Sequence, residues 1–259
     1  MSRAEHAGIH AIVGSHGGVA TGRHAVSVGL ASLICHDAGI GFECAGVEAL
    51  DFVQTYGIAA AGVDYRSARI GDPEDMLARG VISTCNGVAR DAGVREGVTV
   101  AEAQRRLEVL SPPSYPLPDG GKPAFRIAEI DTGKSMRLRL LDSVSSISEQ
   151  DAGAIVVTGS HCGLPEAELN RAIKARAAFV IFNDAGVGRD DAGISRLAPL
   201  AARGIAAACV DAGTARIGDA TSTYERGVLS HVNAAARSRK IVPGQSVMAA
   251  IGMVLCQHT

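Results

Sequence analysis

Residues that could carry acid/base chemistry recur in this chain within matching short motifs. Histidine, aspartate and arginine are the side chains most able to move a proton or to hold an anion. Each occupies the same place in two copies of a motif: GSH at 14–16 and 159–161, DAGxG at 37–41 and 184–188, and ARIGD at 68–72 and 215–219. The repetition predicts two similar sets of polar groups.

The GSH motifs predict glycine-flanked loops between a strand and a helix. Such a loop exposes backbone N–H groups at the positive end of a helix, which suits a carboxylate, a phosphate or an oxyanion. We expect His16 and His161 to act as general acid or base. The expected binding residues of these loops are Ser15, Gly17, Gly18 and Ser160. The alternative is that each serine caps the helix and each histidine bonds locally.

The DAGxG motifs place Asp37 and Asp184 directly after apolar runs, at the ends of predicted strands. A carboxylate there could orient a histidine or a water molecule, or it could cap the next helix. The GxG pattern also resembles part of a dinucleotide-binding fingerprint. However, Cys44 and Asp191 stand where its third glycine belongs, and the preceding aspartate would repel a pyrophosphate, so we do not expect nicotinamide binding.

The ARIGD motifs supply one arginine for each copy, Arg69 and Arg216. Because a guanidinium grips carboxylates in a bidentate manner, these residues, with Asp72 and Asp219, are candidates for substrate binding. An equally open alternative is an arginine that pairs with a nearby aspartate and fixes the loop. Further along, four residues recur at spacings that predict one helical face with structural roles, namely Arg79, Ser83, Asn86 and Arg90 with Arg226, Ser230, Asn233 and Arg237.

The two copies also differ at positions that matter chemically. His36 in the first copy corresponds to Asn183 in the second, so we expect His36 to add a titrating imidazole and Asn183 to bind substrate. Cys44 could be an activated nucleophile, although a small, partly buried side chain is the alternative. These differences predict two functionally unequal loops.

No cofactor is expected. The histidines and aspartates lack a local metal-ligand spacing such as HExxH, and a divalent metal held by His16, His36, His161 and the aspartates is the alternative. The predicted function is a cofactor-independent enzyme that acts on a small anionic metabolite, with hydrolysis of an amide or related acyl bond as the first choice. The alternatives are an isomerase, racemase or lyase acting on a carbon acid, and a non-catalytic binding protein with two equivalent sites.

An internal duplication organises the elements that must position these residues. Residues 35–100 align without gaps on 182–247, with 28 of 66 positions identical. The alternation of apolar runs and helical spacings predicts an α/β fold of two Rossmann-like halves related by a pseudo-two-fold axis. Each half is expected to hold a three-stranded parallel sheet, with a helix over 221–239 in the second. The expected domains are 1–110, a Pro/Gly linker with a β-hairpin at 111–150, and 151–259.

Composition narrows the class of partner. The net charge is −2 and aromatic residues make up 3% of the chain, which argues against nucleic-acid binding. The longest apolar stretch, 247–256, is about half of what a membrane span needs. Six cysteines without a CxxC pair indicate reduced thiols. We therefore expect a cytoplasmic homo-oligomer with a small-molecule substrate and with neither a nucleic-acid nor a membrane partner. The β-hairpin is expected to be an edge ribbon or a subunit contact.

Overall fold

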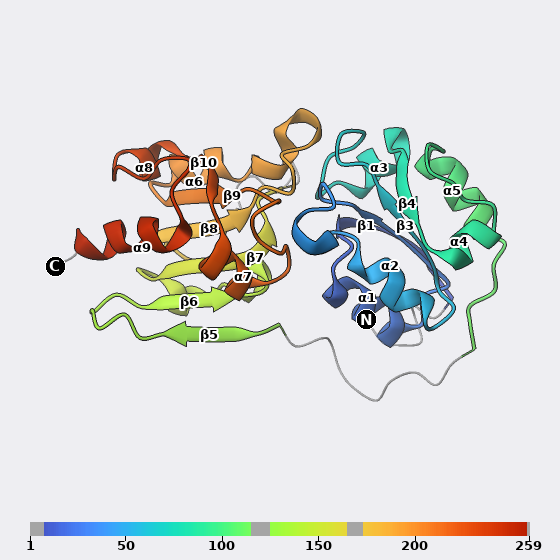
Figure 1. Ribbon diagram of the computed structural model, residues 1–259, viewed down its shortest axis with the longest axis horizontal. Coiled ribbons are helices and arrows are strands. Elements are labelled where there is room, and N and C mark those ends of the chain that lie inside the picture. Colours follow the sequence, from blue (N-terminus) through green and yellow to red (C-terminus); the bar gives the residue numbers. More distant parts are fainter. Residues whose placement is uncertain (1–7, 115–124, 165–172, 258–259) are drawn as a thin grey trace. The chain divides into compact units, whose positions relative to one another are not determined.

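Strands and helices alternate along the chain in the computed structural model, which describes residues 8–114, 125–164 and 173–257 (Figure 1). The fold is α/β, with one mixed sheet of four strands and one of six. Two compact units hold the two sheets. The first comprises Met1–Ile40, Cys44–Ala124 and Gly188–Asp190, and the second comprises Gly41–Glu43, Phe125–Val187 and Asp191–Thr259. Each unit thus includes one tripeptide from the other half of the sequence.

The first unit is built around the strand order β1-β2-β3-β4, in which β1, β2 and β3 are parallel and β4 is antiparallel to β3. Local signals set its helices. For example, the Asp72 side chain accepts a hydrogen bond from the Asp75 amide, and Pro73 follows at the start of the helix. The elements are β1 (His10–His16), α1 (Val19–Val28), β2 (Ser32–His36), α2 (Glu48–Gln54), β3 (Ala59–Val63), α3 (Pro73–Arg79), β4 (Ile82–Cys85), α4 (Gly87–Asp91) and α5 (Val100–Leu107).

The second unit has the strand order β10-β9-β8-β7-β6-β5, in which β6 to β9 run parallel and the two edge strands are antiparallel to their neighbours. Short 3₁₀ helices cover Val144–Ser146, Glu149–Asp151 and Arg189–Ile194. The other elements are β5 (Ile127–Ile130), β6 (Leu138–Leu141), β7 (Ile155–His161), β8 (Phe179–Asn183), α6 (Leu197–Ala202), β9 (Ala206–Val210), α7 (Ala220–Arg226), β10 (Leu229–Val232), α8 (Ala234–Arg237) and α9 (Val247–Cys256).

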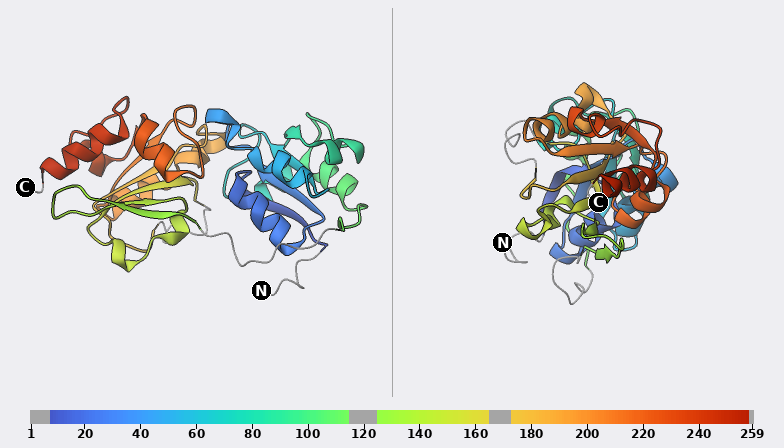
Figure 2. Two further views of the ribbon diagram at one scale, coloured as in Figure 1. Left: turned by 60° about the horizontal axis from the view of Figure 1, so that its bottom comes forward. Right: turned by 90° about the vertical axis from the view of Figure 1, so that its left-hand side faces the viewer.

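Apart from the exposed edge strand β5, each sheet is covered on both faces because alternate residues of its strands pack into two separate apolar clusters. In β3, Ala59 and Ala61 face α3, α4 and α5, whereas Ala60 faces α1 and α2. In β8, Phe179 and Ile181 face α7, α8 and α9, and Phe182 faces α6. Figure 2 shows the helices of each unit on both sides of its sheet. This layering leaves the ends of the strands as the places where polar side chains can gather.

The expectation of two purely parallel, three-stranded sheets is wrong. An antiparallel strand, β4 or β10, follows the third parallel strand in each unit. The predicted helix over 221–239 is instead helix α7, strand β10 and helix α8. Gly227 separates α7 from β10, and its extended backbone, with φ of −60° and ψ of 133°, ends the helix. For the same reason, the four recurring polar residues from Arg79 to Arg90 do not share one helical face.

The predicted β-hairpin is confirmed, since β5 and β6 pair in antiparallel register from Ile127 opposite Leu141 to Ile130 opposite Leu138. It forms the edge of the six-stranded sheet and belongs to the second unit. Residues 115–121 of the predicted Pro/Gly linker lie outside the described residues. Among the described residues, no helix is both long enough and apolar enough to cross a membrane.

Candidate active site

A buried aspartate follows the second strand of each repeated strand set and fastens the strand ends together. In the first unit, Asp37 Oδ1 accepts hydrogen bonds from the amides of Gly39 (2.9 Å) and Tyr65 (3.0 Å). Asp184 in the second unit accepts the corresponding bonds from the Gly186 (2.9 Å) and Ala212 (3.0 Å) amides. One carboxylate oxygen of each aspartate therefore shapes the following turn and the end of the next strand.

Each aspartate also bonds to a serine from the antiparallel strand. Ser230 Oγ donates to Asp184 Oδ2 at 2.7 Å, a short charge-assisted hydrogen bond, and also lies 3.3 Å from the Cys209 carbonyl oxygen. In the first unit Ser83 bonds to Asp37. Burial raises the pKa of Asp37, while the hydrogen bonds from Ser83, Gly39 and Tyr65 act to lower it. Both units thus hold a serine hydroxyl against a desolvated carboxylate.

A β-bulge aims this serine. Leu229 and Val232 are three residues apart, yet both pack into the same apolar cluster, which a regular strand with alternating side chains does not allow. The register between β10 and β9 shifts at this point, from Leu229 opposite Val210 to His231 opposite Cys209. The extra residue leaves Ser230 and His231 outside that cluster, and bulges commonly re-aim side chains next to active sites. The same shift occurs in β4, between Ile82 and Thr84.

At the position after this serine, the second unit has an imidazole and the first has a threonine. His231 Nδ1 lies 3.1 Å from Ser230 Oγ, whereas Thr84 stands at the corresponding position of the first unit. Because Ser230 Oγ uses its proton in the bond to Asp184, it accepts the second hydrogen bond, which His231 Nδ1 donates. Asp184, Ser230 and His231 form a continuous carboxylate, hydroxyl and imidazole arrangement, which we call the Ser230 cluster.

The two GSH motifs lie at the ends of β1 and β7, as the sequence suggests, and they contact the ARIGD loops. The Gly71 amide donates to the Gly14 carbonyl at 2.7 Å, and the Gly218 amide donates to the Gly159 carbonyl at 2.6 Å. An added Cβ on Gly14 would lie 2.8 Å from the Gly71 carbonyl carbon. Part of the GSH and ARIGD repetition is therefore explained by close packing between two backbones.

The amides that follow the loop histidines are already bonded within the protein. Gly17 donates to the carbonyls of His36 (3.1 Å) and Gly46 (2.8 Å), and Cys162 donates to the Asn183 carbonyl (2.9 Å). Ser160 Oγ accepts a hydrogen bond from the Val144 amide at 2.9 Å. These groups are engaged in holding the loops, and they do not point to an oxyanion site.

His16 is half-buried, and its ring packs over Gly18, where an added Cβ would lie 2.7 Å from Nε2. Ser15 Oγ lies 3.3 Å from His16 Nδ1. Burial, and then the neighbouring His36, lower the pKa of His16 to about 4, so its imidazole is neutral at pH 7. His161, at the end of β7, pairs in register with Asn183 just as His16 pairs with His36.

His36 and Asn183 make the same two hydrogen bonds with different chemical groups. The Ala38 amide donates to His36 Nδ1 at 3.0 Å, and His36 Nε2 donates to the Ala68 carbonyl at 3.1 Å. Asn183 Oδ1 accepts from the Ala185 amide (2.9 Å) and its Nδ2 donates to Ala215 (3.2 Å). Burial lowers the pKa of His36 to about 4, against a smaller raising effect of the Ala68 carbonyl. Both ring nitrogens are thus used in holding the loop.

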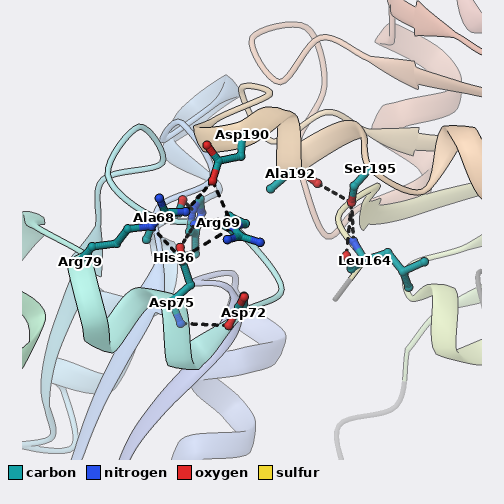
Figure 3. Close-up of polar contacts among 10 residues, drawn as sticks. All are labelled: His36, Ala68, Arg69, Asp72, Asp75, Arg79, Leu164, Asp190, Ala192 and Ser195. Carbon is teal, nitrogen blue, oxygen red and sulfur yellow. Dashed lines mark hydrogen bonds and ion pairs between the residues drawn. The ribbon is translucent and has the colours of Figure 1, made fainter. Parts of the chain in front are cut away.

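The arginines of the ARIGD motifs face carboxylates of the chain. In the first unit, which includes Gly188–Asp190, Asp190 Oδ2 lies 3.2 Å from Arg69 Nε and 2.6 Å from Arg79 Nη2, and Arg79 Nε lies 2.7 Å from Asp75 (Figure 3). The pKa of Asp190 is lowered, and the hydrogen bond from Arg79 is the main cause.

The second unit, which includes Gly41–Glu43, holds a comparable ion pair of 2.7 Å between Arg216 Nη1 and Glu43. Asp72 and Asp219 cap helices α3 and α7 with their side chains. Asn86 and Asn233 likewise cap α4 and α8. The geometry therefore favours the alternative in which the ARIGD residues fix loops.

The remaining candidates are dispersed. Cys44 is exposed and has a left-handed backbone with φ of 58°. Within 8–114, 125–164 and 173–257, no group of three or more His, Cys, Asp or Glu side chains is arranged to hold a metal ion. No family model, no curated protein and no solved structure matches this chain.

Proposed function

We propose that the protein is a cofactor-independent hydrolase of an ester, amide or related acyl bond, with Ser230 as the nucleophile. The observation that carries the proposal is the position of Ser230 Oγ, 2.7 Å from a carboxylate oxygen of Asp184 and 3.1 Å from Nδ1 of His231. A serine hydroxyl is a weak nucleophile until an adjacent base takes its proton, and hydrogen-bond reach is the first requirement of that base.

The chemistry follows from the direction of these hydrogen bonds. As Ser230 Oγ attacks the acyl carbon, its proton passes to Asp184 Oδ2, and His231 holds Oγ in place through its Nδ1 proton. Asp184 then returns the proton to the leaving group, which departs and leaves an acyl-serine. Water then attacks the carbonyl carbon of this ester and gives a proton to Asp184. Asp184 passes the proton to Ser230 Oγ as the Oγ–carbon bond breaks, and the carboxylic acid leaves. Asp184 is suited to this because its other oxygen is fixed by two amides.

The Ser230 cluster replaces the GSH histidines as the centre of the proposal. The predicted roles of His16 and His161 as acid or base remain untested. The anionic substrate was predicted from Arg69 and Arg216, and both now face carboxylates of the chain. We therefore propose a small acyl compound as the substrate without requiring a negative charge on it.

We further propose that the two units are copies of one βα unit, of which the second carries the reaction. The identity between residues 35–100 and 182–247 supports this, as do the shared strand order β1 to β4 and β7 to β10 and the paired hydrogen bonds of Asp37 and Asp184. Duplication explains why the same framework appears twice. The second copy alone has a histidine, His231, beside its serine and aspartate, and we therefore assign the reaction to it.

Labelling with a fluorophosphonate, which reacts with activated serines, tests the proposal. We expect one adduct on the peptide that contains Ser230, lost in Ser230→Ala and strongly reduced in His231→Gln. Ser83 is the matched control, because it occupies the same bulge and contacts the equivalent aspartate without an adjacent histidine. Absence of an adduct on Ser230, or equal labelling of Ser83 and Ser230, with folding verified by circular dichroism, would reject the mechanism.

A further inference from the structure

Asp64 and Asp211 hold equivalent places, directly after strands β3 and β9, and they differ in what covers them. Arg66 binds the Asp64 carboxylate with two groups, since its Nε lies 3.1 Å from Oδ1 and its Nη2 lies 3.0 Å from Oδ2. The Asp64 side chain is therefore only 22% exposed. In the second unit Gly213 stands in the place of Arg66, and Asp211 is exposed. The same carboxylate is thus covered by a guanidinium in one unit and open in the other.

Only one oxygen of Asp211 is used within its loop. Oδ1 accepts a hydrogen bond from the Gly213 amide at 2.7 Å, just as Asp64 Oδ1 accepts one from the Arg66 amide at 2.8 Å. Across residues 8–114, 125–164 and 173–257, no further hydrogen bond and no ion pair reaches the Asp211 carboxylate. The two aspartates therefore share the role of shaping the loop, and Asp211 keeps its charge for another partner.

The space above Asp211 is open as well. Tyr65 lies against the Arg66 guanidinium in the first unit, with 5.4 Å between the ring centre and Cζ, and Ala212 stands in its place in the second unit. Apart from the residues next to it in the chain, an added Cβ on Gly213 would meet only Asp211 Oδ1, at 3.1 Å. The second unit thus lacks both large side chains of this loop.

Asp211 lies beside the Ser230 cluster. Both of its neighbours in the chain contact Asp184, whose amide donates to the Val210 carbonyl at 2.9 Å and whose Oδ1 accepts from the Ala212 amide at 3.0 Å. Val210 points into the apolar cluster under α7, α8 and α9, so the next side chain, that of Asp211, points to the opposite face. Ser230 also lies outside that apolar cluster. The two side chains are therefore on the same side of the sheet.

The equivalent carboxylates of the first unit are close enough to interact. Burial is the main cause of the raised pKa of Asp37, and the charge of Asp64 adds to it. The pKa of Asp64 is itself lowered, chiefly by the hydrogen bond from Arg66. Because the second unit shares this framework, a cation held by Asp211 lies within reach of an acyl group held at Ser230.

We propose that Asp211 binds a cationic group of the substrate, so that the hydrolase acts on a small acyl compound that carries an ammonium or a guanidinium. This inference rests on the proposed function and names its substrate class. The substrate cation takes the place that the Arg66 guanidinium holds beside Asp64, where a carboxylate can accept one or two charge-assisted hydrogen bonds. Asp211 determines specificity and takes no part in the transfer of protons at Ser230.

Paired aryl esters test the proposal. Each pair shares one methylene spacer and ends in either a trimethylammonio or a tert-butyl group, which have the same shape and differ in charge, and the pairs cover spacers of increasing length. For the best spacer, the ratio of kcat/KM for the cationic to the neutral ester should fall about fivefold in Asp211→Asn, the scale of an exposed ion pair. High salt should reduce the same ratio, because exposed charges are screened.

The matched control is Asp64→Asn, which makes the same change in the first unit and should leave the ratio as it is in the unmodified protein. Gly213→Arg restores the arginine of the first unit beside Asp211 and should lower the ratio as Asp211→Asn does. Gly213→Gln adds similar bulk without a charge and should affect both esters alike. A ratio that falls equally in the two Gly213 variants would show that bulk alone acts there, and would contradict the proposal.

The same measurements separate this inference from the function on which it rests. Hydrolysis that depends on Ser230, with a ratio that Asp211→Asn leaves unchanged at every spacer length, would reject the substrate class alone. If neither ester is hydrolysed, or if hydrolysis persists in Ser230→Ala, the proposed function fails and the substrate class fails with it.

Discussion

Strands β4 and β10 occupy equivalent places in the two units and share a bulge, a serine and a contact from that serine to a buried aspartate. They differ at the next residue, which is Thr84 in β4 and His231 in β10. The shared features are those that hold the backbone, and the residue that differs is the one that adds an imidazole beside the serine. The comparison separates a structural framework from the chemistry placed on it.

His36 and Asn183 teach the converse lesson. They differ in type, and a histidine invites a catalytic interpretation, yet each accepts one amide and donates to one carbonyl in the same loop. A chemical difference between duplicated positions therefore indicates function only where the hydrogen-bond partners differ as well. That condition holds for Thr84 and His231, because only His231 reaches the bulged serine.

The largest expected effect is on acyl hydrolysis and comes from the two serines. Ser230→Ala should lower the rate with an activated aryl ester by about 10³-fold or more, the usual scale for loss of a nucleophile that works with its base. Ser83→Ala should leave that rate within about twofold, because Ser83 lies in the first unit and contacts no reacting group of the Ser230 cluster. Equal losses in the two variants would mean that the units act alike and that the comparison fails.

Exchanging the differing residue sharpens the comparison. His231→Thr gives the second unit the side chain of the first, and we expect kcat to fall by about 10²-fold, the scale of misplacing a reacting atom, because Ser230 Oγ loses the hydrogen bond that holds it. Thr84→His should make Ser83 reactive toward the fluorophosphonate, because it places an imidazole beside Ser83. The new side chain has room, since the residue opposite is Gly62, which is smaller than the Cys209 opposite His231. The readout is the ratio of labelled Ser83 to labelled Ser230, and an unchanged ratio would show that the histidine is not what distinguishes the units.

His36 provides a stability test of the shared framework. His36→Ala should reduce the free energy of unfolding by about 3 kcal/mol, because the Ala38 amide and the Ala68 carbonyl lose their partners in a buried site. His36→Asn copies the second unit and should cost less than half of that. Urea denaturation at pH 7 measures both variants. A similar loss in both would show that the hydrogen bonds of Asn183 cannot be transplanted.

The same residue predicts a difference in acid sensitivity. Burial lowers the pKa of His36 from 6.5 to about 4, so the folded state favours the neutral imidazole. The stabilisation is complete above the unfolded value of 6.5 and is lost as the pH falls from about 6.5 to about 4, a change of about 3 kcal/mol. His16, half-buried, contributes with the same sign, and Asp37, whose pKa is raised, acts with the opposite sign.

His36→Asn removes the His36 contribution together with the smaller part of the His16 shift that His36 causes, and it should flatten the loss of stability between pH 6.5 and 4 relative to the unmodified protein. Urea denaturation at several pH values in this interval provides the comparison. Parallel curves for the two proteins would contradict the assignment of this acid sensitivity to His36.

Much of the framework was predictable because the signals are local. Apolar runs gave the parallel strands, Gly57 and Gly204 marked the expected stops and adopt φ near 70°, and the alternating pattern gave the β5–β6 hairpin. The antiparallel strands were missed because a four-residue bulged strand has neither the period of a strand nor that of a helix. The spacing of four residues between Tyr224, Val228 and Val232 indicated a helix instead.

The site was predictable only in part. Asp184 was identified from its place after a strand, but its partner Ser230 lies 46 residues away and reaches it only through the bulge. His231 has no counterpart in the first copy, so a search for repeated residues passes over it. The ARIGD arginines were recognised as anion-binding groups, but the sequence could not show that carboxylates of the same chain, at Asp190 and Glu43, are the anions they meet.

Trapping of the acyl-enzyme tests the central claim most directly. The protein is mixed with an activated acetyl ester, quenched in acid within the first turnover, digested and analysed by mass spectrometry. The account predicts one acetyl group on Ser230, a burst of released alcohol equal to the enzyme concentration, and neither signal in Ser230→Ala. Hydrolysis that persists without an acetylated Ser230, or acetylation of Ser83 to the same extent, would contradict it.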